Sequence, residues 1–318
     1  MNPKTCSLGQ AVDYYLATRQ QWGFALKTEA RTLHQLVGYA EQHAYTGPLT
    51  TELVLAWAQQ PATAAPRWWA SRLGTAQRFA RFWAVLDPRT EVPPSGVFGP
   101  FCSRSPVHFY TTEQILQVFQ VAGTLEPLDS LRPFAFQTLW GLLACTGLRV
   151  GEALRLQLDD FDGAAATLTI RRSKFGRSRC LPLLPSTVVA LQTYGQHRQH
   201  YFPQTPHRQL FLSLTGQPLS YSQTEKTFRA IRTRLGWHFS PQPRLYDLRH
   251  HFATERLLDW YRQGQTQMEQ HIHTLATYLG HRQIRHTYWY LSAVPELLAL
   301  ANARAAALTP AGSGGSHD

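Results

Sequence analysis

The stretch TLTIRRSKFGRSRCLPL, residues 167–183, alternates between apolar and polar side chains, turns near residues 175–176 and alternates again. This is the pattern of a β-hairpin. The chain on either side has the period of helices: a long apolar segment ends at Gly147, and helical patterns resume at about Pro185. The predicted fold class is therefore mainly α, with a small antiparallel β-hairpin or sheet set among helices.

The chain divides at a segment rich in proline. Residues 8–86 have helical patterns throughout, whereas residues 87–106 contain five prolines together with turn-forming glycine and serine. We therefore expect four parts: a helical domain at residues 1–87, a linker at 88–108, a second domain at 109–308 that ends in an alanine-rich helix, and a flexible tail at 309–318.

Composition limits the class of protein. The 318 residues include 31 Lys and Arg against 20 Asp and Glu, a net charge of +11. This surplus suits nucleic acid, although an anionic membrane surface or plain solubility would also fit. No apolar run has the roughly 20 residues of a membrane span, and the N-terminus lacks a signal-peptide core, so we expect a cytoplasmic protein. The four cysteines are scattered, which argues against a cysteine zinc site or a disulfide framework.

The turn of the hairpin is strongly basic. Five cations lie within nine residues: Arg171, Arg172, Lys174, Arg177 and Arg179. A solvated turn would account for them. The single lysine is nevertheless informative, because lysine can release a proton near neutral pH and arginine cannot. A proton donor for a departing oxygen would have to be Lys174.

Three further stretches carry groups suited to an anion. In TGLRVGEALRLQLDDFD, Arg149 lies at an expected helix start. A cation is unfavourable there unless the arginine and the helix N-terminus together bind a phosphate. Glu152 follows at i+3, where it can brace the guanidinium. In PRLYDLRHHFATERLL, Tyr246 and Arg249 lie one helical turn apart on one face. Together with Arg149, Arg249 would complete a clamp of two guanidiniums. In TYLGH, a glycine ends a helix and His281 projects from the break.

The stretch YLGHRQIRHTYWYL, residues 278–291, contains a candidate nucleophile. Its apolar stripe consists of Ile284, Tyr288 and Leu291. Tyr290 lies about 200° around the helix from Tyr288, so the two hydroxyls cannot share a face. We therefore assign Tyr288 to packing and Tyr290 to a site, with the alternative that both rings are ordinary core or rim aromatics.

In their order along the chain, the five stretches resemble the tyrosine recombinases, also called the phage integrase family, over roughly residues 109–305. The resemblance places the family's first arginine and its acid at Arg149 and Glu152, the hairpin lysine at Lys174, the second arginine at Arg249, and the final histidine and nucleophile at His281 and Tyr290. The chain departs from the family at Tyr246, where a histidine is usual. A phenol is a poorer proton acceptor, and His250 or His281 could compensate.

The resemblance implies a site-specific DNA recombinase or integrase that serves a mobile element, in integration or transposition. Tyr290 would attack a DNA phosphodiester to give a 3′-phosphotyrosine, Arg149 and Arg249 would stabilise the transition state, and no metal or other cofactor would be required. DNA contacts are expected from basic side chains of both domains: Arg67, Arg72, Arg78, Arg171, Arg172, Arg177 and Arg179.

The resemblance also implies a mode of assembly. The N-terminal domain and the catalytic domain would form a C-shaped clamp on double-stranded DNA that carries a specific site, in the bacterial cytoplasm or nucleoid. A monomer or dimer would become a tetramer on the DNA, with possible partner recombinases. The C-terminal helix, from Pro295 to about Leu308, would pack either on a neighbouring protomer or on its own domain.

Two other functions fit the same residues. A type IB topoisomerase-like enzyme would use related chemistry to relax DNA without strand exchange. A DNA-binding regulator could keep the fold without the chemistry. A metal site built from the histidines is disfavoured, because His271 and His273 would diverge on a helix.

Overall fold

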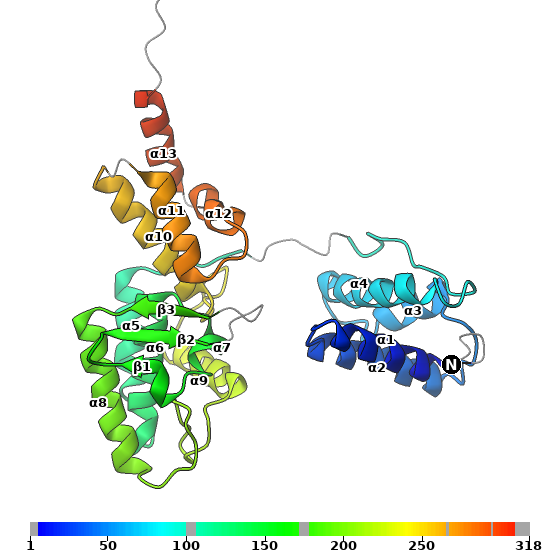
Figure 1. Ribbon diagram of the computed structural model, residues 1–318, viewed down its shortest axis with the longest axis horizontal. Helices are drawn as coiled ribbons and strands as arrows, with labels where there is room; N and C mark the ends of the chain where they lie inside the picture. Colours follow the sequence, from blue (N-terminus) through cyan, green and yellow to red (C-terminus); the bar gives the residue numbers. More distant parts are fainter. Residues whose placement is uncertain (1–5, 100–105, 172–177, 265–266, 294, 309–318) are drawn as a thin grey trace, which may run out of the picture. The chain divides into compact units, whose positions relative to one another are not determined.

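The computed structural model of the chain describes residues 6–99, 106–171, 178–264, 267–293 and 295–308. It has two compact units, Met1–Ser105 and Pro106–Asp318, which we describe one at a time. Helices predominate in both, and the second also contains a small antiparallel sheet (Figure 1). The predicted fold class, mainly helical with a small antiparallel sheet, is confirmed.

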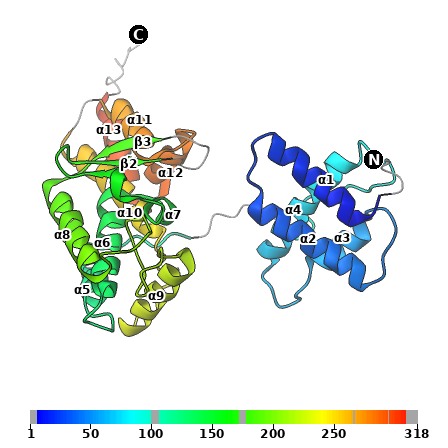
Figure 2. The same cartoon turned by 60° about the horizontal axis from the view of Figure 1, so that its bottom comes forward.

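Within residues 6–99, four helices form the first unit (Figure 2). They are α1 (Leu8–Gln21), α2 (Lys27–Gln42), α3 (Thr51–Ala58) and α4 (Pro66–Trp83). Two of them start where the sequence provides a hydroxyl: Ser7 caps α1 and Thr50 caps α3, each accepting a hydrogen bond from a backbone N–H of the first turn. Their apolar faces meet in a core that includes Leu36, Val54 and Phe79.

The segment that follows α4 packs back onto the first unit. The Gln77 side chain donates to two proline carbonyl oxygens of this segment, at 3.1 and 2.8 Å. The Glu91 carboxylate accepts from the backbone N–H of Thr51 at 2.8 Å. The stretch expected to be a linker, residues 88–108, therefore begins as a part of the helical unit, because its polar groups pair with groups on α3 and α4.

The second unit combines helices with the sheet. Its helices are α5 (Thr112–Ala122), α6 (Leu131–Thr146), α7 (Val150–Ala153), the 3₁₀ helix η2 (Leu158–Asp160), α8 (Pro185–Tyr201), α9 (Tyr221–Arg234), α10 (Asp247–Arg262), α11 (Met268–Leu279), α12 (Arg285–Ala293) and α13 (Pro295–Leu308). Glycines in the left-handed conformation end α6 and α11, Gly147 at φ 60° and Gly280 at φ 69°.

The sheet has the strand order β1-β2-β3, with β1 (Phe161–Asp162), β2 (Thr167–Ile170) and β3 (Arg179–Pro182). β2 and β3 pair in antiparallel register, from Thr167 opposite Pro182 to Ile170 opposite Arg179. The two predicted strands and their antiparallel pairing are thus confirmed, whereas the turn predicted near residues 175–176 lies outside the described residues. β1 was not predicted, because two residues are too few to show an alternating pattern.

Two apolar clusters divide the second unit, and Figures 1 and 2 show the helices and strands that they involve. The larger one includes Leu139, Phe211 and Phe228 and involves the sheet together with α5, α6, α8 and α9. The smaller one involves α10 to α13 and includes Leu257 and Ile272. Helix α10 also packs on α6. The carboxyl end of α6 and the helices α10 to α12 therefore come together, and the candidate site lies there.

The C-terminal helix α13 packs on its own domain. Leu297 is fully buried in the same cluster as Tyr290. Glu296 forms a salt bridge with Arg262 of α10, at 2.6 Å. In the single chain, α13 contacts α10 and α12.

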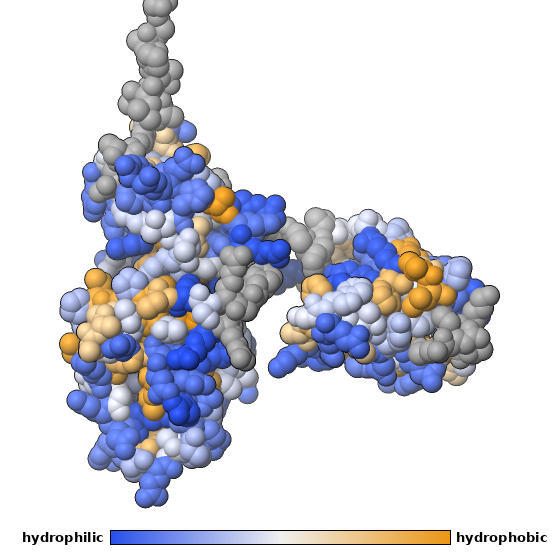
Figure 3. Space-filling model, in the orientation of Figure 1, coloured by the Kyte–Doolittle hydropathy of each residue, from blue (hydrophilic) through white to orange (hydrophobic). Residues whose placement is uncertain are grey.

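The surface is mostly polar. Hydrophilic side chains cover much of the face of each unit seen in Figure 3, in keeping with the net charge of +11. No helix in the described part of the chain combines the length and the apolar character needed to cross a membrane.

Candidate active site

The carboxyl end of α11 gathers three guanidinium groups. Three distances describe the contact: Arg179 Nε lies 2.7 Å from the carbonyl oxygen of Tyr278, Arg249 Nη2 lies 2.7 Å from that of Leu279, and Arg149 Nη2 lies 3.3 Å from that of Gly280. The last carbonyls of a helix have no partner within it and carry partial negative charge. Three consecutive oxygens thus bind arginines from β3, from α10 and from the start of α7.

Glu152 lies among these arginines. Its Oε1 accepts from Arg149 Nη1 at 2.8 Å, so the contact expected between these two residues is present. Its Oε2 accepts from Arg179 Nη2 at 2.9 Å. Burial by itself would raise the pKa of Glu152, but Arg179 and Arg149 lower the pKa to about 2. The carboxylate is therefore ionised and fixed between two cations.

The helix expected to start at Arg149 is short. Arg149 is the N-cap of α7, which has only four residues. A single turn has little macrodipole, so the anion-binding capacity of this segment comes from the guanidinium and not from the helix.

Arg249 is the most deeply buried arginine of the group, with 1% of its surface exposed. Besides Leu279, it donates to the carbonyl oxygen of Gly147, at 2.8 Å. Its Nε is buried and has no hydrogen-bond partner among the described residues. Burial and the neighbouring charge of Arg149 lower the pKa of Arg249 to about 10. Arg249 is therefore still a cation at neutral pH, and its Nε–H has no acceptor among the described residues.

Tyr290, on α12, lies beside these charges and is 2% exposed. Burial raises its pKa to about 12, although the charges of Arg249 and Arg149 act in the opposite direction. Its ring centroid is 5.5 Å from that of His250 and 6.3 Å from that of His281. In the free protein Tyr290 is therefore a protonated phenol close to two guanidiniums and two imidazoles.

Tyr288 does not lie on the packing face of α12 as predicted, although Ile284 and Leu291 of the same stripe do pack against the smaller cluster. Tyr288 was assigned to packing, but it is 40% exposed, whereas Tyr290 and Thr287 are buried. The assignment was wrong because the face of α12 that packs on α10 and α11 is also the face that meets the arginines. The two tyrosines do point to different faces, as their spacing requires.

His281 follows Gly280 at the break predicted from the sequence. Its Nδ1 lies 2.8 Å from the hydroxyl oxygen of Thr287, and its backbone N–H donates to the last turn of α11. Burial, followed by the charges of Arg249 and Arg149, lowers the pKa of His281 to about 3. The imidazole is therefore neutral at physiological pH. Thr287 was not singled out from the sequence, because no motif links it to the histidine six residues before it.

Tyr246 and His250 form the outer part of the group. Tyr246 precedes α10 and is 44% exposed. The His250 ring lies 5.0 Å from the Tyr246 ring and 5.5 Å from the Tyr290 ring, by centroid distance. His250 is thus the imidazole that lies between the two tyrosines.

The arginines expected to contact DNA are in unlike positions in the first unit. Arg72 is 7% exposed, with its guanidinium 4.0 Å from the ring centroid of Trp57 and 4.4 Å from that of Trp68, and it donates to a backbone carbonyl. Burial lowers its pKa to about 10. The expectation for Arg72 is therefore corrected: it is a packing residue. Arg67 is exposed, and Arg78 is half-exposed and paired with Glu29.

The hairpin arginines also differ from one another. Arg171 is 59% exposed and paired with Asp160. Only 11% of the Arg179 side chain is exposed, and its nitrogens bind α11 and Glu152, so its position does not favour the expected DNA contact. Sequence reasoning missed this place for Arg179, which depends on the pairing register of the hairpin. Lys174, Arg172 and Arg177 lie outside the described residues.

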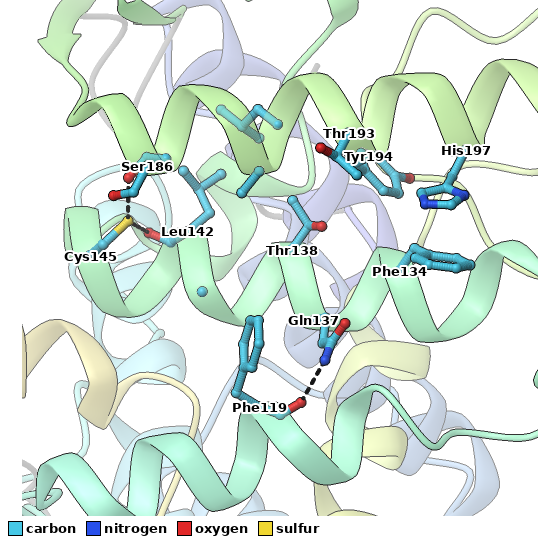
Figure 4. A pocket seen from close by; sticks show the side chains of 14 residues that line it. Phe119, Phe134, Gln137, Thr138, Leu142, Cys145, Ser186, Thr193, Tyr194 and His197 are labelled. Atoms are coloured by element: carbon cyan, nitrogen blue, oxygen red, sulfur yellow. Dashed lines mark hydrogen bonds between the residues drawn. The ribbon is translucent and has the colours of Figure 1, made fainter.

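The arginine group is not part of the apolar pocket in Figure 4. That pocket, of about 330 Å³, lies between α6 and α8, and Phe119, Phe134, Leu142 and Tyr194 are among its lining residues. None of the candidate catalytic side chains in the described residues lines it. Nor do the described residues contain a cluster of His, Cys, Asp or Glu side chains that could hold a metal ion.

Comparison with known proteins gives one family match and several relatives. Residues 109–296 match the model of the phage integrase family. Putative integrase/recombinase y4rB of Sinorhizobium fredii (strain NBRC 101917 / NGR234) is 40% identical over 296 residues, which cover 91% of this chain and 94% of that protein. Tyrosine recombinase XerC of Chromobacterium violaceum is 28% identical over 196 residues, which cover 59% of this chain and 60% of that protein.

Solved structures share the fold. The Tn1549 transposon integrase in complex with circular intermediate DNA has a TM-score of 0.69 and 16% identity, over 96% of this chain and 100% of that one. The XerH site-specific recombinase bound to palindromic difH substrate, in a post-cleavage complex, has a TM-score of 0.60 and 17% identity, over 94% of this chain and 84% of that one.

Proposed function

Because the chain belongs to the phage integrase family, which comprises tyrosine recombinases, we propose that it cuts and rejoins DNA strands through a covalent 3′-phosphotyrosine at Tyr290. One observation carries the proposal: the Tyr290 phenol lies within the electrostatic reach of Arg249 and Arg149 and beside the His250 ring. A phenol, two fixed guanidiniums and an imidazole are suited to phosphoryl transfer.

Arg249 and Arg149 bind the phosphate in this proposal. The buried Nε of Arg249 has no acceptor among the described residues, and a non-bridging phosphate oxygen would supply one. Arg149 has 24% of its side chain exposed, so DNA can reach it from solvent. His281 is neutral, with Nδ1 2.8 Å from the Thr287 hydroxyl oxygen. We assign the tautomer in which Nδ1 accepts from this hydroxyl and Nε2–H donates to the same phosphate.

The proposed reaction is an in-line displacement at phosphorus. The Tyr290 oxygen forms a bond to phosphorus, and the bond from phosphorus to the 5′ oxygen breaks. The phenol must lose its proton, since its pKa is about 12 in the free protein. We assign the proton to His250, which lies next to Tyr290, because Tyr246 is a weaker acceptor than the histidine usual in the family.

Lys174 donates the proton that the 5′ oxygen acquires as it leaves. It precedes Arg179 by five residues along the hairpin, and the Arg179 guanidinium is bound at the carboxyl end of α11. A positioned acid of this kind typically contributes 10²–10⁴-fold to a rate, as an order of magnitude. Attack of a new 5′ hydroxyl on the phosphotyrosine reverses the steps, so that rejoining needs no nucleotide.

The proposed substrate is double-stranded DNA with a specific site, and the proposed setting is a mobile element in a bacterial cytoplasm or nucleoid. The net charge of +11 suits this substrate, and the transposon integrase with the same fold is bound to DNA in its structure. Arg67, Arg78 and Arg171 are the exposed side chains that we assign to DNA contacts. The protein would be a monomer or dimer when free and a tetramer on DNA, with possible partner recombinases.

Trapping of a covalent adduct tests the proposal. Nicked duplexes that cover the DNA flanking the gene allow cleavage but not rejoining, and the adduct is detected on a denaturing gel. We expect an adduct with the unmodified protein and none with Tyr290→Phe, which should still bind DNA. Tyr288→Phe is the matched control, because Tyr288 lies on the exposed face of the same helix, and it should form the adduct normally.

Three outcomes would contradict the proposal in different ways. An adduct with Tyr290→Phe would move the nucleophile, first to Tyr288. Absence of any adduct with the unmodified protein, on all fragments that it binds, would favour a DNA-binding regulator. Relaxation of supercoiled plasmids that lack the site would favour a type IB topoisomerase-like enzyme.

A further inference from the structure

Arg179 occupies the first position of β3. Its three side-chain nitrogens all have acceptors: Nε donates to the carbonyl oxygen of Tyr278 at 2.7 Å, and Nη2 and Nη1 lie 2.9 and 3.3 Å from the two carboxylate oxygens of Glu152. The planar guanidinium fits such a fork, which a lysine ammonium cannot reproduce. Each nitrogen of the Arg179 guanidinium is thus hydrogen-bonded within the protein, which disfavours a contact with a DNA phosphate.

The partner of Arg179 is also the partner of Arg149. Glu152 receives Arg149 Nη1 on Oε1 at 2.8 Å and the Arg149 backbone N–H on Oε2 at 3.2 Å. The carboxylate is therefore held from two sides, by β3 and by the segment that bears Arg149. Removal of Arg179 would free Glu152 to rotate, and the Arg149 guanidinium would lose a fixed partner.

Space around Gly280 is filled by the same side chain. A Cβ at this glycine would lie 2.9 Å from Arg179 Nη1 and 3.2 Å from its Cζ. Gly280 has φ 69°, and its carbonyl oxygen accepts from Arg149. Arg179 therefore packs against the residue that supports Arg149 and precedes His281.

We propose that Arg179 is a positioning residue: it fixes Arg149 through Glu152 and ties β3 to the carboxyl end of α11. The inference rests on the proposed function, since that function assigns Arg149 to the chemistry. It replaces the DNA contact expected from the sequence with a role inside the protein.

The experiment compares three variants. Arg179→Met removes the charge at similar length, and Arg179→Lys keeps the charge but loses the fork. Arg198→Met is the matched control. Arg198, on α8, is 4% exposed and donates to the backbone carbonyls of His207 and Gln209, at 2.6 and 3.2 Å. For each variant we would measure the Kd for DNA at several salt concentrations, and the rate of adduct formation at saturating DNA as a function of pH.

For Arg179→Met we expect a rate about 100-fold lower, because small displacements of a catalytic group have effects of this size. We expect the Kd and its salt dependence to stay within about twofold, since no phosphate contact is lost. Arg179→Lys should recover part of the rate. Arg198→Met should lower stability and yet leave the rate per folded molecule unchanged.

The pH profile separates positioning from a general loss of stability. The charged groups that face Glu152 are Arg149, Arg179 and, further away, Arg249. Without Arg179, burial still raises the pKa of Glu152 and fewer cations oppose it. The acid limb of the rate should therefore move to higher pH in Arg179→Met and, to a smaller extent, in Arg179→Lys, but not in Arg198→Met.

Two results would overturn the inference. A weaker Kd with a shallower salt dependence would make Arg179 a phosphate contact. An unchanged rate and pH profile would make it a purely structural residue, and if Arg179→Met does not fold, the same criterion applies to Arg179→Lys. If the unmodified protein forms no adduct, the proposed function fails separately. A crystal structure of Arg179→Lys then decides: Arg149 should have left the Gly280 carbonyl, and an unmoved Arg149 refutes the inference.

Discussion

Arg72 in the first unit and Arg249 in the second are buried to a similar degree in very different surroundings. They are 7% and 1% exposed, burial lowers the pKa of each to about 10, and the Nε of each lacks a hydrogen-bond partner among the described residues. Arg72 lies between the faces of two tryptophans, whereas Arg249 lies on backbone carbonyls beside a second guanidinium, Arg149.

The comparison shows that burial alone does not mark a functional arginine. Aromatic faces attract a cation, so the surroundings of Arg72 satisfy it as it stands. A neighbouring guanidinium repels a cation, so the charge on Arg249 remains unfavourable until an anion joins the pair. Perturbed groups of the second kind are characteristic of sites where charge develops during a reaction.

The largest effect should come from Arg249→Lys. We expect the rate of adduct formation at saturating DNA to fall by about 1000-fold, because the compact lysine ammonium lacks the planar fork with which a guanidinium spans two carbonyl oxygens and a phosphate. Single-turnover kinetics on nicked DNA measure this. Arg72→Lys should stay within about threefold of the unmodified protein, and similar losses in both variants would break the comparison.

The counterpart is Arg72→Met, which should affect folding and not chemistry. Loss of the contact with two tryptophan faces and of a charged hydrogen bond should lower the unfolding free energy of the first unit by about 2–4 kcal/mol. Tryptophan fluorescence during urea unfolding of the whole chain reports it. Normal stability together with a reduced adduct rate would show that Arg72 belongs to the reaction after all.

Lowering the pH should destabilise the second unit through Glu152, whose pKa is about 2 in place of the ordinary 4.5. A carboxyl whose pKa is lowered by folding stabilises the protein above its ordinary pKa, and this contribution disappears as pH falls through the folded value. The stability of the second unit should therefore decline from about pH 4.5 towards pH 2, and Glu152→Gln should flatten that decline.

A control fixes the meaning of the acid experiment. Asp159→Asn removes a carboxylate that is 58% exposed in its pair with Arg208, and exposed pairs contribute little to stability. The variant should retain the decline of the unmodified protein. If Glu152→Gln retains it as well, the arginines do not depend on this carboxylate for their arrangement.

The smallest effect should come from Tyr246→His. Tyr246 is 44% exposed and contacts the His250 ring from the solvent side of the group. Histidine is the better proton acceptor at neutral pH, so the rate should be preserved or rise by up to about tenfold. Kinetics between pH 6 and 8 measure it, and a collapse of the rate would show that the phenol has a task of its own.

Sequence predicted the features that depend on neighbours along the chain. The helical periods, the alternation of the hairpin, the Arg149–Glu152 contact at i+3 and the break at Gly280 all follow from local spacing, and the structure has each of them. The family resemblance added the order of the boxes, which no single stretch would have established.

Features set by packing between distant elements could not be predicted in this way. Arg72 is buried because α3 and α4 bring Trp57 and Trp68 to either side of it. Arg179 meets Glu152 because the pairing register of β2 and β3 and the fold bring the start of β3 to α7. Tyr288 was assigned to the wrong face because the side of α12 that packs on α10 and α11 holds Tyr290.

The oxygens that hold the three guanidiniums at the end of α11 belong to the peptide backbone. A codon change at Tyr278 or Leu279 replaces a side chain but cannot delete an acceptor. Side-chain substitutions at Tyr278 and Leu279 therefore leave the acceptors of these guanidiniums in place. Gly280 is the exception, since any other residue there would need a left-handed backbone and would collide with Arg179.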